Sequence, residues 1–334
     1  MTKNLAITVL TWNDWENTVK CLESIYQSTF SDFDVILVNN NSDQIHLDKI
    51  YEWSKNKIRI EDEEINFNPN KNIEIIEVNN NYLVEDKGKK KIYLIQNKKN
   101  LGLTAGINVG YKFVINQRYN YLARIDCDFI ITKNYLKDMI DLFQKDSEIA
   151  AASPKIMHAY LRDTVWWYQF KMNWFYLKFQ QTMNLQKKRI LNNSRLKGII
   201  ETDAICGCCS IYNINKLKLS GLGDEEFFLG PEDIELSYRL KKFGKLVCNL
   251  DCYTFHKIAR STFVSGKFRR SYTDTLGFLL LIKKIGTMSD KLFGYLYFLL
   301  RIPFYLLLLI LRKREKENVY GYLAGCRDFF LKKK

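Results

Sequence analysis

Two acidic segments carry residues whose types and spacing suit chemistry, and the richer one runs from Gly223 to Arg239. It holds six carboxylates around an apolar knot of two Phe and one Leu. Glu232 and Asp233 follow Pro231 directly and precede apolar positions at helical spacing, so we expect a helix to begin there. A helix N-terminus favours an ionised carboxylate, which suits a general base or a neighbour of a metal ion. The segment alone is equally compatible with an acidic first turn that only caps a helix.

The second acidic segment is Asp126-Cys127-Asp128, which directly follows the apolar run 121–125. Alternate residues of an extended chain share one face, so both carboxylates can point the same way. Paired hard oxygens at the carboxyl end of a strand suit Mg²⁺ or Mn²⁺ carrying a diphosphate. His256, one of three histidines, follows another short strand. A lone histidine is usually structural, but beside such a pair we interpret it as a metal ligand.

The elements that must position these groups resemble a nucleotide-binding sheet. Residues 5–11 and 34–38 are apolar runs typical of strands buried on both faces, and residue 14 can cap the helix between them. The second run ends in a polar cluster at 39–43, as in nucleotide-binding βαβ units. After a further strand at 92–96, the glycine-spaced segment 100–110 lets backbone approach a ligand. A further strand is expected at 204–212, with Gly207 where another backbone or a ligand comes close.

Two regions depart from this pattern. Residues 54–90, rich in Asn, Lys and Glu, are interpreted as a variable insertion, with a hairpin as one possible form. Residues 157–200 hold Trp166, Trp167 and Trp174 among basic residues. Aromatic faces stack on sugars, so this region suits an acceptor groove, and a small aromatic core is the equally weighted alternative.

Composition limits the function classes. The 334 residues hold one large domain, or one domain with an appendage, and the net charge of +14 favours an anionic partner. The basic residues are scattered in the first half and concentrated after Arg260, which speaks against a nucleic-acid partner. The first apolar run is too short for a secretory signal, and eight cysteines within mostly apolar segments fit a reduced, cytoplasmic setting better than disulfides or zinc.

The C-terminal part predicts membrane association. Residues 276–281 and 292–311 are strongly apolar, with Arg301 and Pro303 inside the second run and basic clusters on both of its sides. Basic residues on both flanks argue against a simple span. We therefore expect a helix broken at Pro303 that lies in the cytoplasmic leaflet, with the clusters on anionic lipid. A single transmembrane span is the alternative.

Taken together in order, these motifs resemble the inverting glycosyltransferases of family 2, which have the nucleotide-diphospho-sugar-binding GT-A fold. The resemblance covers roughly residues 4–268 and is closest to the rhamnosyl- and galactofuranosyl-type members that build surface polysaccharides. Its matching segments are 10–13, 38–43, 100–108, 126–128, 224–228, 232–239 and His256. It implies an α/β fold with a mostly parallel central sheet flanked by helices.

The resemblance also implies roles for individual residues. Asp233, with Glu232 beside it, would be the base that takes the proton of the acceptor hydroxyl, and Asp128 and His256 would hold the metal ion. Asn39 departs from the family, which usually has an acidic residue there contacting the nucleotide. The implied donor-binding residues are Thr11, Asn13, Asn39, Asn41, Asn100, Gly102, Gly106, Asn108 and Asp126. The implied acceptor-binding residues are Trp166, Trp167, Asp224 and Glu225.

We therefore expect a glycosyltransferase domain at 1–270 and a helical, membrane-associated region at 271–334. The expected activity is metal-dependent hexosyl or deoxyhexosyl transfer from a nucleotide-diphospho-sugar to a lipid-linked glycan, with Mg²⁺ or Mn²⁺, at the cytoplasmic face of the cell membrane. Two alternatives remain: a polyprenyl-phosphate sugar synthase of the same fold, and a catalytically silent, lectin-like glycan-binding module.

Overall fold

The structure is a computed structural model of the chain, and it describes residues 4–63, 65, 68–69, 73–78, 90–161, 163–173, 178–181, 196–257, 266–311 and 315–331. Trp174, the stretch 260–262 and, within the predicted insertion at 54–90, residues 64, 66–67, 70–72 and 79–89 lie outside this part.

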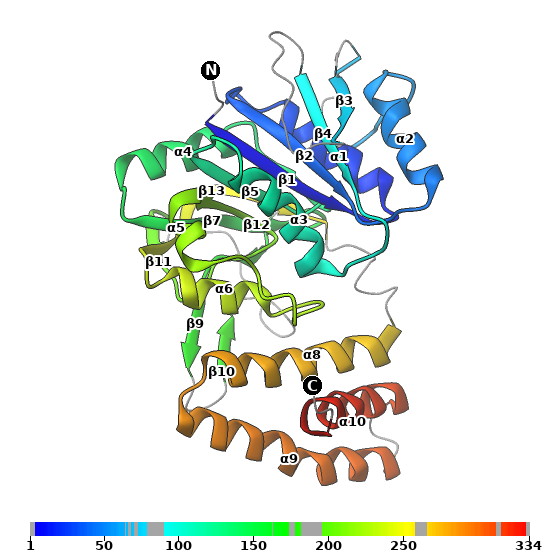
Figure 1. Cartoon of the computed structure of the whole chain (residues 1–334), viewed down its shortest axis with the longest axis vertical. Coiled ribbons are helices and arrows are strands. Elements are labelled where there is room, and N and C mark those ends of the chain that lie inside the picture. Colours follow the sequence, from blue (N-terminus) through cyan, green and yellow to red (C-terminus); the bar gives the residue numbers. More distant parts are fainter. Residues whose placement is uncertain are drawn as a thin grey trace.

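A mixed β-sheet forms the centre of the molecule (Figure 1). One half is parallel, with the strand order β3-β4-β2-β1-β5. These strands are β1 (Leu5–Thr11), β2 (Phe33–Asn39), β3 (Ile73–Glu77), β4 (Lys90–Gln96) and β5 (Tyr121–Ile125). Successive strands add outward from β1 to β2 and β4, and the chain then returns to place β5 on the other side of β1. In such open sheets ligands bind at the carboxyl ends of the strands, where this order reverses.

The other half of the sheet continues as β12-β7-β13-β11, and β12 is antiparallel to both of its neighbours. β13 runs parallel to β7 and also pairs with the short strand β6, which opposes His256 to Phe129. The strands are β6 (Phe129–Ile131), β7 (Ile149–His158), β8 (Val165–Trp167), β11 (Ile199–Glu201), β12 (Cys209–Asn213) and β13 (Lys245–His256), with a separate pair of β9 (Phe170–Asn173) and β10 (Lys178–Gln181).

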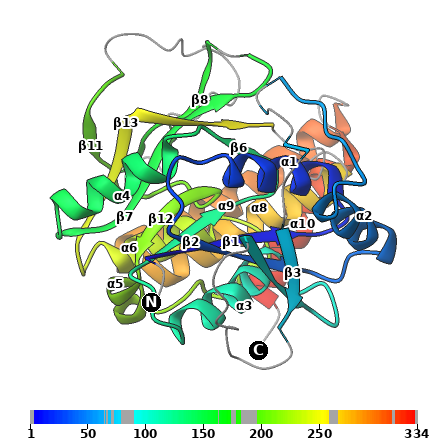
Figure 2. The same ribbon diagram turned by 90° about the horizontal axis from the view of Figure 1, so that it is seen from above.

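Helices cover both faces of the sheet, as the view from above shows (Figure 2). β1 and β2 are buried over almost their whole length because apolar side chains leave both faces. One apolar core gathers side chains of α1, α2 and α4, and the other gathers those of α3, α5 and α6. The helices are α1 (Trp15–Tyr26), α2 (Gln44–Ser54), α3 (Leu103–Ile115), α4 (Tyr135–Lys145), α5 (Ile214–Ser220) and α6 (Glu232–Leu240).

Three further helices form a layer below the sheet in Figure 1: α8 (Gly266–Ile285), α9 (Met288–Ile310) and α10 (Lys316–Leu331). They have their own apolar core, in which Leu279, Phe298 and Tyr322 are buried. α8 lies next to both α9 and α10 and also contacts α6. The C-terminal region is thus packed against the element that carries Glu232 and Asp233.

The predicted fold class is confirmed: an α/β sheet flanked by helices with a helical C-terminal region. The runs predicted at 5–11 and 121–125 are strands with those bounds, and Asp14 caps α1 by accepting the Asn17 N–H. α8 begins at Gly266, four residues before the expected domain boundary at 270. The division of the chain into two domains at that boundary stays a prediction.

In the described part of the insertion, β3 pairs in parallel with β4 and Asp62 forms an isolated antiparallel bridge with Ile65, so a hairpin elsewhere in the insertion stays a prediction. Two local predictions need correction. The strand expected at 204–212 begins only at Cys209, because residues 204–208 turn back to meet α6. α9 is not broken at Pro303 but continues through it. Phe298 and Tyr305, buried on either side of the proline, pack both halves of α9 against the same core, which offsets the lost N–H bond.

Candidate active site

Polar side chains line the carboxyl ends of the parallel strands. Thr11, Asn39 and Gln96 lie side by side in register at the ends of β1, β2 and β4. Asn39 is 3% exposed, and its Oδ1 accepts the Ser42 N–H at 2.9 Å, so it shapes the loop that follows. Because an amide replaces a carboxylate here, this edge offers a nucleotide hydrogen bonds but no negative charge.

The loops after β1 and β2 are joined to each other. The Asn13 backbone N–H donates to Ser42 Oγ at 3.0 Å, and Asn13 Oδ1 accepts the Asp43 N–H at 2.7 Å. Asn13 and Asn41 both have positive φ, 52° and 65°, a conformation that Asn tolerates better than most residues. The two loops therefore form one surface beside the strand ends, as expected for a ligand-binding edge.

Asn40 is a residue of this edge that sequence reasoning did not select. It is 3% exposed, and its Nδ2 donates to Asn100 Oδ1 and to the Gly102 carbonyl, both at 3.0 Å. Its Oδ1 accepts from Asn97 Nδ2 at 3.0 Å and from the Leu101 N–H at 3.1 Å. It thus fixes the glycine-spaced segment to the β2 loop. Its central place in the run of three asparagines was the available signal.

The two predicted donor-segment glycines are needed for close packing. Gly102 has a φ of 83°, and a Cβ there would lie 2.6 Å from the Phe228 ring. A Cβ on Gly106 would lie 3.0 Å from Leu10 and 3.1 Å from Asn40. The Leu103 N–H also donates to the Phe228 carbonyl at 2.9 Å. The predicted donor segment therefore lies directly against the acidic segment at 224–233.

Arg124 links the two acidic segments, and sequence reasoning missed it. Its guanidinium donates to both Asp126 oxygens, at 2.9 and 3.2 Å, and to Glu232 Oε1 at 3.3 Å. The Arg124 side chain is only 5% exposed, so these charges neutralise one another in a poorly solvated place. A single cation inside the apolar run 121–125 was the signal that could have revealed it.

Asp233 lies beside this cluster at the start of α6. Its Oδ2 accepts the Gly207 N–H at 3.1 Å, and its Oδ1 accepts the Ile234 N–H at 2.9 Å. A Cβ on Gly207 would lie 2.8 Å from both Asp233 and Arg124, so side chains, and not the predicted backbone or ligand, make the close approach at Gly207. Burial, and then the negative charge of Glu232, raise the pKa of Asp233 to about 6. Such a carboxylate is largely ionised at neutral pH yet is a better proton acceptor than an ordinary aspartate.

Asp128 and His256 form the candidate metal pair. β6 and β13 pair so that His256 Nε2 lies 3.1 Å from Asp128 Oδ2. The two atoms are within hydrogen-bonding distance of each other, and a carboxylate oxygen and an imidazole nitrogen this close could both bind one divalent ion. Phe129 stacks on the imidazole at 4.5 Å, and Trp166 meets it edge-on at 4.4 Å.

Among the described residues, no group of three or more His, Cys, Asp or Glu side chains gathers as a metal site. A divalent ion held by Asp128 and His256 would therefore need substrate phosphates and water to complete its coordination shell.

The predicted acceptor residues lie in different environments. Trp166 is partly exposed and adjoins His256, whereas Trp167 is 3% exposed in the main core, which indicates packing rather than acceptor contact. Asp224 forms an ion pair with Lys284 of α8. Glu225 accepts from Asn108 Nδ2 at 3.0 Å and from Lys112 at 2.9 Å. Asn108, predicted to bind the donor, thus directs these hydrogen bonds to the acidic segment.

The chain is similar in sequence to a known family and in fold to several known proteins. Residues 62–213 match the model of Glycosyl transferase family 2. This stretch includes Arg124, Asp126 and Asp128 and ends before Asp233 and His256. No protein of curated function matches the chain in sequence.

Several solved structures share the fold. The chain resembles residues 1–349 of S. aureus TarS with 15% identity and a TM-score of 0.54, covering 98% of this chain and 80% of that one. TarS 1–349 in complex with UDP gives 15% identity, a TM-score of 0.50, and coverages of 86% and 68%. GalNAc-T7 with UDP, GalNAc and Mn²⁺ gives 14% identity and a TM-score of 0.52, covering 76% of this chain. The match spans only 44% of the GalNAc-T7 chain. At such identities the likeness establishes a common GT-A-type fold.

Proposed function

We propose that this protein is an inverting, metal-dependent glycosyltransferase that moves a hexosyl or deoxyhexosyl group from a nucleotide-diphospho-sugar to a lipid-linked glycan. The family 2 match and the shared fold support a glycosyltransferase that uses a nucleotide sugar. The observation that carries the proposal is that a donor edge, a metal pair and a carboxylate of raised pKa surround the ends of the same strands.

The donor would lie along the carboxyl edge of the parallel strands. Asn39 and Thr11 are buried, so they would hold the shape of the edge that receives the nucleotide, and the backbone of the segment 100–106 would approach the sugar or phosphates. UDP is the nucleotide to test first, because a neighbour of the same fold is described in complex with it. The rhamnosyl- or galactofuranosyl-type specificity implied by the sequence resemblance belongs to this proposal.

Asp128 and His256 would hold Mg²⁺ or Mn²⁺. The bound ion would neutralise charge that develops on the departing diphosphate. The description of GalNAc-T7 with Mn²⁺ supports testing that ion first. Arg124 orients Asp126 next to this pair and opposes the rise in the Asp126 pKa that burial causes.

Asp233 would act as the catalytic base. The acceptor hydroxyl attacks the anomeric carbon from the side opposite the diphosphate, and its proton passes to an Asp233 carboxylate oxygen. The new glycosidic bond forms as the bond to the diphosphate breaks, which inverts the configuration. The backbone N–H groups of Gly207 and Ile234 hold the carboxylate in place for this step. Trp166, and Asp224 and Glu225 on the neighbouring loop, are the proposed acceptor contacts.

The C-terminal helices would place the site at a membrane surface. α9 is long and apolar enough to cross a membrane, which by itself is weak evidence. However, one side of α9 packs against the core of α8 and α10, while Leu300, Phe304 and Leu307 on the other side are 50–64% exposed. A helix of this kind is suited to lie in the interface with its apolar face in lipid. Surface polysaccharide synthesis at the cytoplasmic face is the corresponding role.

A turnover screen tests the proposal. The full chain would be incubated with a panel of nucleotide-diphospho-sugars, with Mn²⁺, Mg²⁺ or excess chelator, while nucleoside diphosphate release and glycan products are measured. We expect release with at least one donor, its loss in chelator, and its recovery on adding either ion. Binding without any turnover would favour the silent glycan-binding module. Transfer to free polyprenyl phosphate but not to a glycan would favour the synthase.

A further inference from the structure

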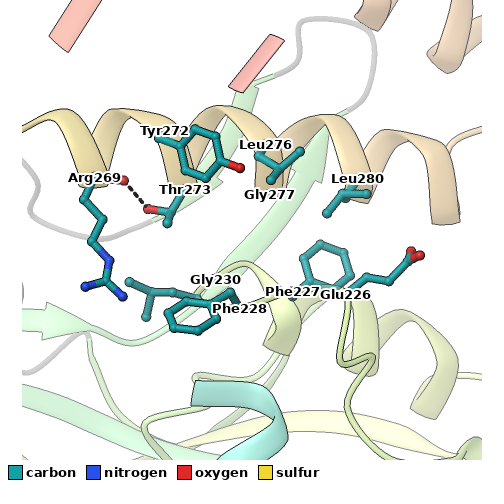
Figure 3. A pocket seen from close by; sticks show the side chains of 11 residues that line it. Glu226, Phe227, Phe228, Gly230, Arg269, Tyr272, Thr273, Leu276, Gly277 and Leu280 are labelled. Carbon is teal, nitrogen blue, oxygen red and sulfur yellow. Dashed lines mark hydrogen bonds between the residues drawn. The ribbon is translucent and has the colours of Figure 1, made fainter. Parts of the chain in front are cut away.

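A largely apolar pocket of about 300 Å³ lies between the acidic loop at 226–230 and α8, outside the catalytic groups described above (Figure 3). On the loop side it is lined by Phe227, Phe228 and Leu229, and on the helix side by Leu276 and Leu280. Its size is at the lower end of the ~300–1,000 Å³ typical of small-molecule sites. It therefore has room for a short apolar group.

One end of the pocket is cationic. Arg269, in the first turn of α8, lines this end, and its guanidinium lies 5.3 Å from the centre of the Phe228 ring. Figure 3 shows the side chain extending from α8 toward the loop. No ion pair joins Arg269 to a carboxylate within the described part of the chain. A guanidinium over an aromatic ring, beside a helix N-terminus, is suited to receive an anion such as a phosphate.

The other end is closed by protein charges. Lys284 Nζ pairs with Asp224 and, at 2.6 Å, with Glu226 Oε2, which also lines the pocket. One lysine against two carboxylates leaves these groups with a net negative charge, so an anion has a favourable place only at the Arg269 end. This charge distribution favours an elongated ligand with a single anionic group at one end.

The pocket also adjoins the proposed reaction centre. Phe228 packs over Gly102 of the donor segment, and Gly230 is three residues before Asp233. Gly277 of α8 lies so close that a Cβ would be 2.5 Å from the Gly230 carbonyl oxygen. A group held in the pocket would therefore contact Phe228, which packs on the donor segment, and the loop that leads into Asp233.

We propose that this pocket binds the first isoprenoid or alkyl units of a lipid phosphate that carries the acceptor, with Arg269 paired to the phosphate. The proposal rests on the proposed function and names the part of the acceptor that the site recognises. A single chain is the occupant because about 300 Å³ admits the start of one chain but not the two parallel chains of a phospholipid. The apolar outer face of α9, on the same helical layer, would keep the protein at the membrane where such a lipid resides.

The direct test is binding of farnesyl phosphate to the full chain in detergent, measured by calorimetry, with farnesol, inorganic phosphate and phosphatidylglycerol as comparison probes. We expect farnesyl phosphate to bind more tightly than all three. Arg269→Gln should weaken the binding of farnesyl phosphate about tenfold or more and that of farnesol much less, because only the phosphate would pair with the Arg269 guanidinium. Leu276→Trp should fill the pocket and weaken both, whereas Leu276→Met should bind like the wild type.

The matched control is Leu219→Trp on the surface of α5, where the side chain is 67% exposed and does not line this pocket. It should leave farnesyl phosphate binding unchanged. Unweakened binding by Leu276→Trp, in a protein that melts at the wild-type temperature, would overturn the proposal. So would equal affinity for phosphatidylglycerol. Nucleoside diphosphate release by the wild type without acceptor tests the proposed function separately, so failure of one claim is distinguishable from failure of the other.

Discussion

Glu232, Asp233 and Arg124 form a charged group whose balance sets the proton affinity of the proposed base. Arg124 faces Glu232 and lowers the pKa of Asp233, whereas burial and the Glu232 charge raise it more strongly. The two neighbouring carboxylates at the N-terminus of α6 therefore differ in what they bind. Glu232 accepts a hydrogen bond from the Arg124 guanidinium, whereas the Asp233 carboxylate remains able to accept a proton. The division of roles follows from environment rather than residue type.

The first prediction concerns pH. If Asp233 must be ionised, kcat/KM for transfer should rise with pH through about 6 and then level off. Glu232→Gln removes a negative neighbour, so the pKa of Asp233 should fall and the acid limb should move to lower pH. Activity near pH 7.5 should fall less in this variant than in Asp233→Asn. A pH–rate profile from 4.5 to 8.5 measures this, and an acid limb that stays in place or moves upward would contradict it.

The second prediction concerns stability. The pKa of Asp233 rises from its usual 3.8 to about 6 on folding, so ionising it costs the folded state roughly 3 kcal/mol. The cost is absent below pH 3.8, grows between the two values and is complete above 6. Asp233→Asn stays neutral, although its amide replaces one of the two oxygens that accept backbone N–H bonds.

The difference in Tm between Asp233→Asn and the wild type should therefore shift by several degrees in favour of the variant from pH 4 to pH 7.5. Thermal denaturation followed by circular dichroism at both pH values measures it. A Tm difference that is the same at both would show that Asp233 has no raised pKa.

Among the secondary-structure elements, the acidic loop and α8 depend on each other. Lys284 pairs with two loop carboxylates, and Gly277 packs against the loop backbone just ahead of α6. The loop that leads into Glu232 and Asp233 is thus held in place by contacts with α8 of the C-terminal region. A helix outside the central sheet contributes to the geometry of the site.

Lys284→Gln should accordingly lower transfer several-fold, because Asp224 and Glu226 are left repelling each other and the loop loses its link to α8. The stability loss should be only about 1 kcal/mol, since the ion pairs are partly exposed. Lys283→Gln, one residue earlier and exposed, is the matched control and should behave like the wild type. If steady-state kinetics show the same activity for both variants, the loop is positioned without α8.

The sequence predicted elements well where the signal is local. The strands at 5–11 and 121–125 are apolar runs bounded by polar residues, and Pro231 with the acids after it marks the start of α6. The contact between Lys284 and the acidic loop could not be predicted, because it joins segments some sixty residues apart and has no local pattern. The prediction of a helix break at Pro303 was wrong for a related reason: tertiary packing of Phe298 and Tyr305 outweighs the free-energy cost of the hydrogen bond that proline cannot donate.

At the scale of the whole molecule, the layer of α8, α9 and α10 lies on one side of the sheet domain and presents the outer face of α9 to solvent (Figure 1). Since its other face packs on protein, we propose that α9 lies in a membrane surface and does not cross the membrane. The net charge of +14 would add attraction to anionic lipid.

The double variant Leu300→Glu with Leu307→Glu should reduce co-sedimentation with vesicles of anionic phospholipid by on the order of tenfold or more. The reason is that two exposed apolar side chains, which would insert into the lipid, become charged. Leu219→Glu on α5, equally exposed, should bind vesicles like the wild type. High salt alone should release little of the wild-type protein, because apolar burial is not screened. Equal vesicle binding by the double variant and the control would refute a membrane role for this face.

The central claim is that this chain transfers sugar by means of Asp233. The most direct measurement compares glycan product formed by the wild type and by Asp233→Asn, with the same donor, metal ion and acceptor. The variant should lose about 10²-fold or more of the transfer rate, the scale of losing a general base, while its donor affinity stays nearly unchanged. Near-normal transfer by Asp233→Asn, or no transfer by the wild type with any nucleotide sugar, would contradict the account.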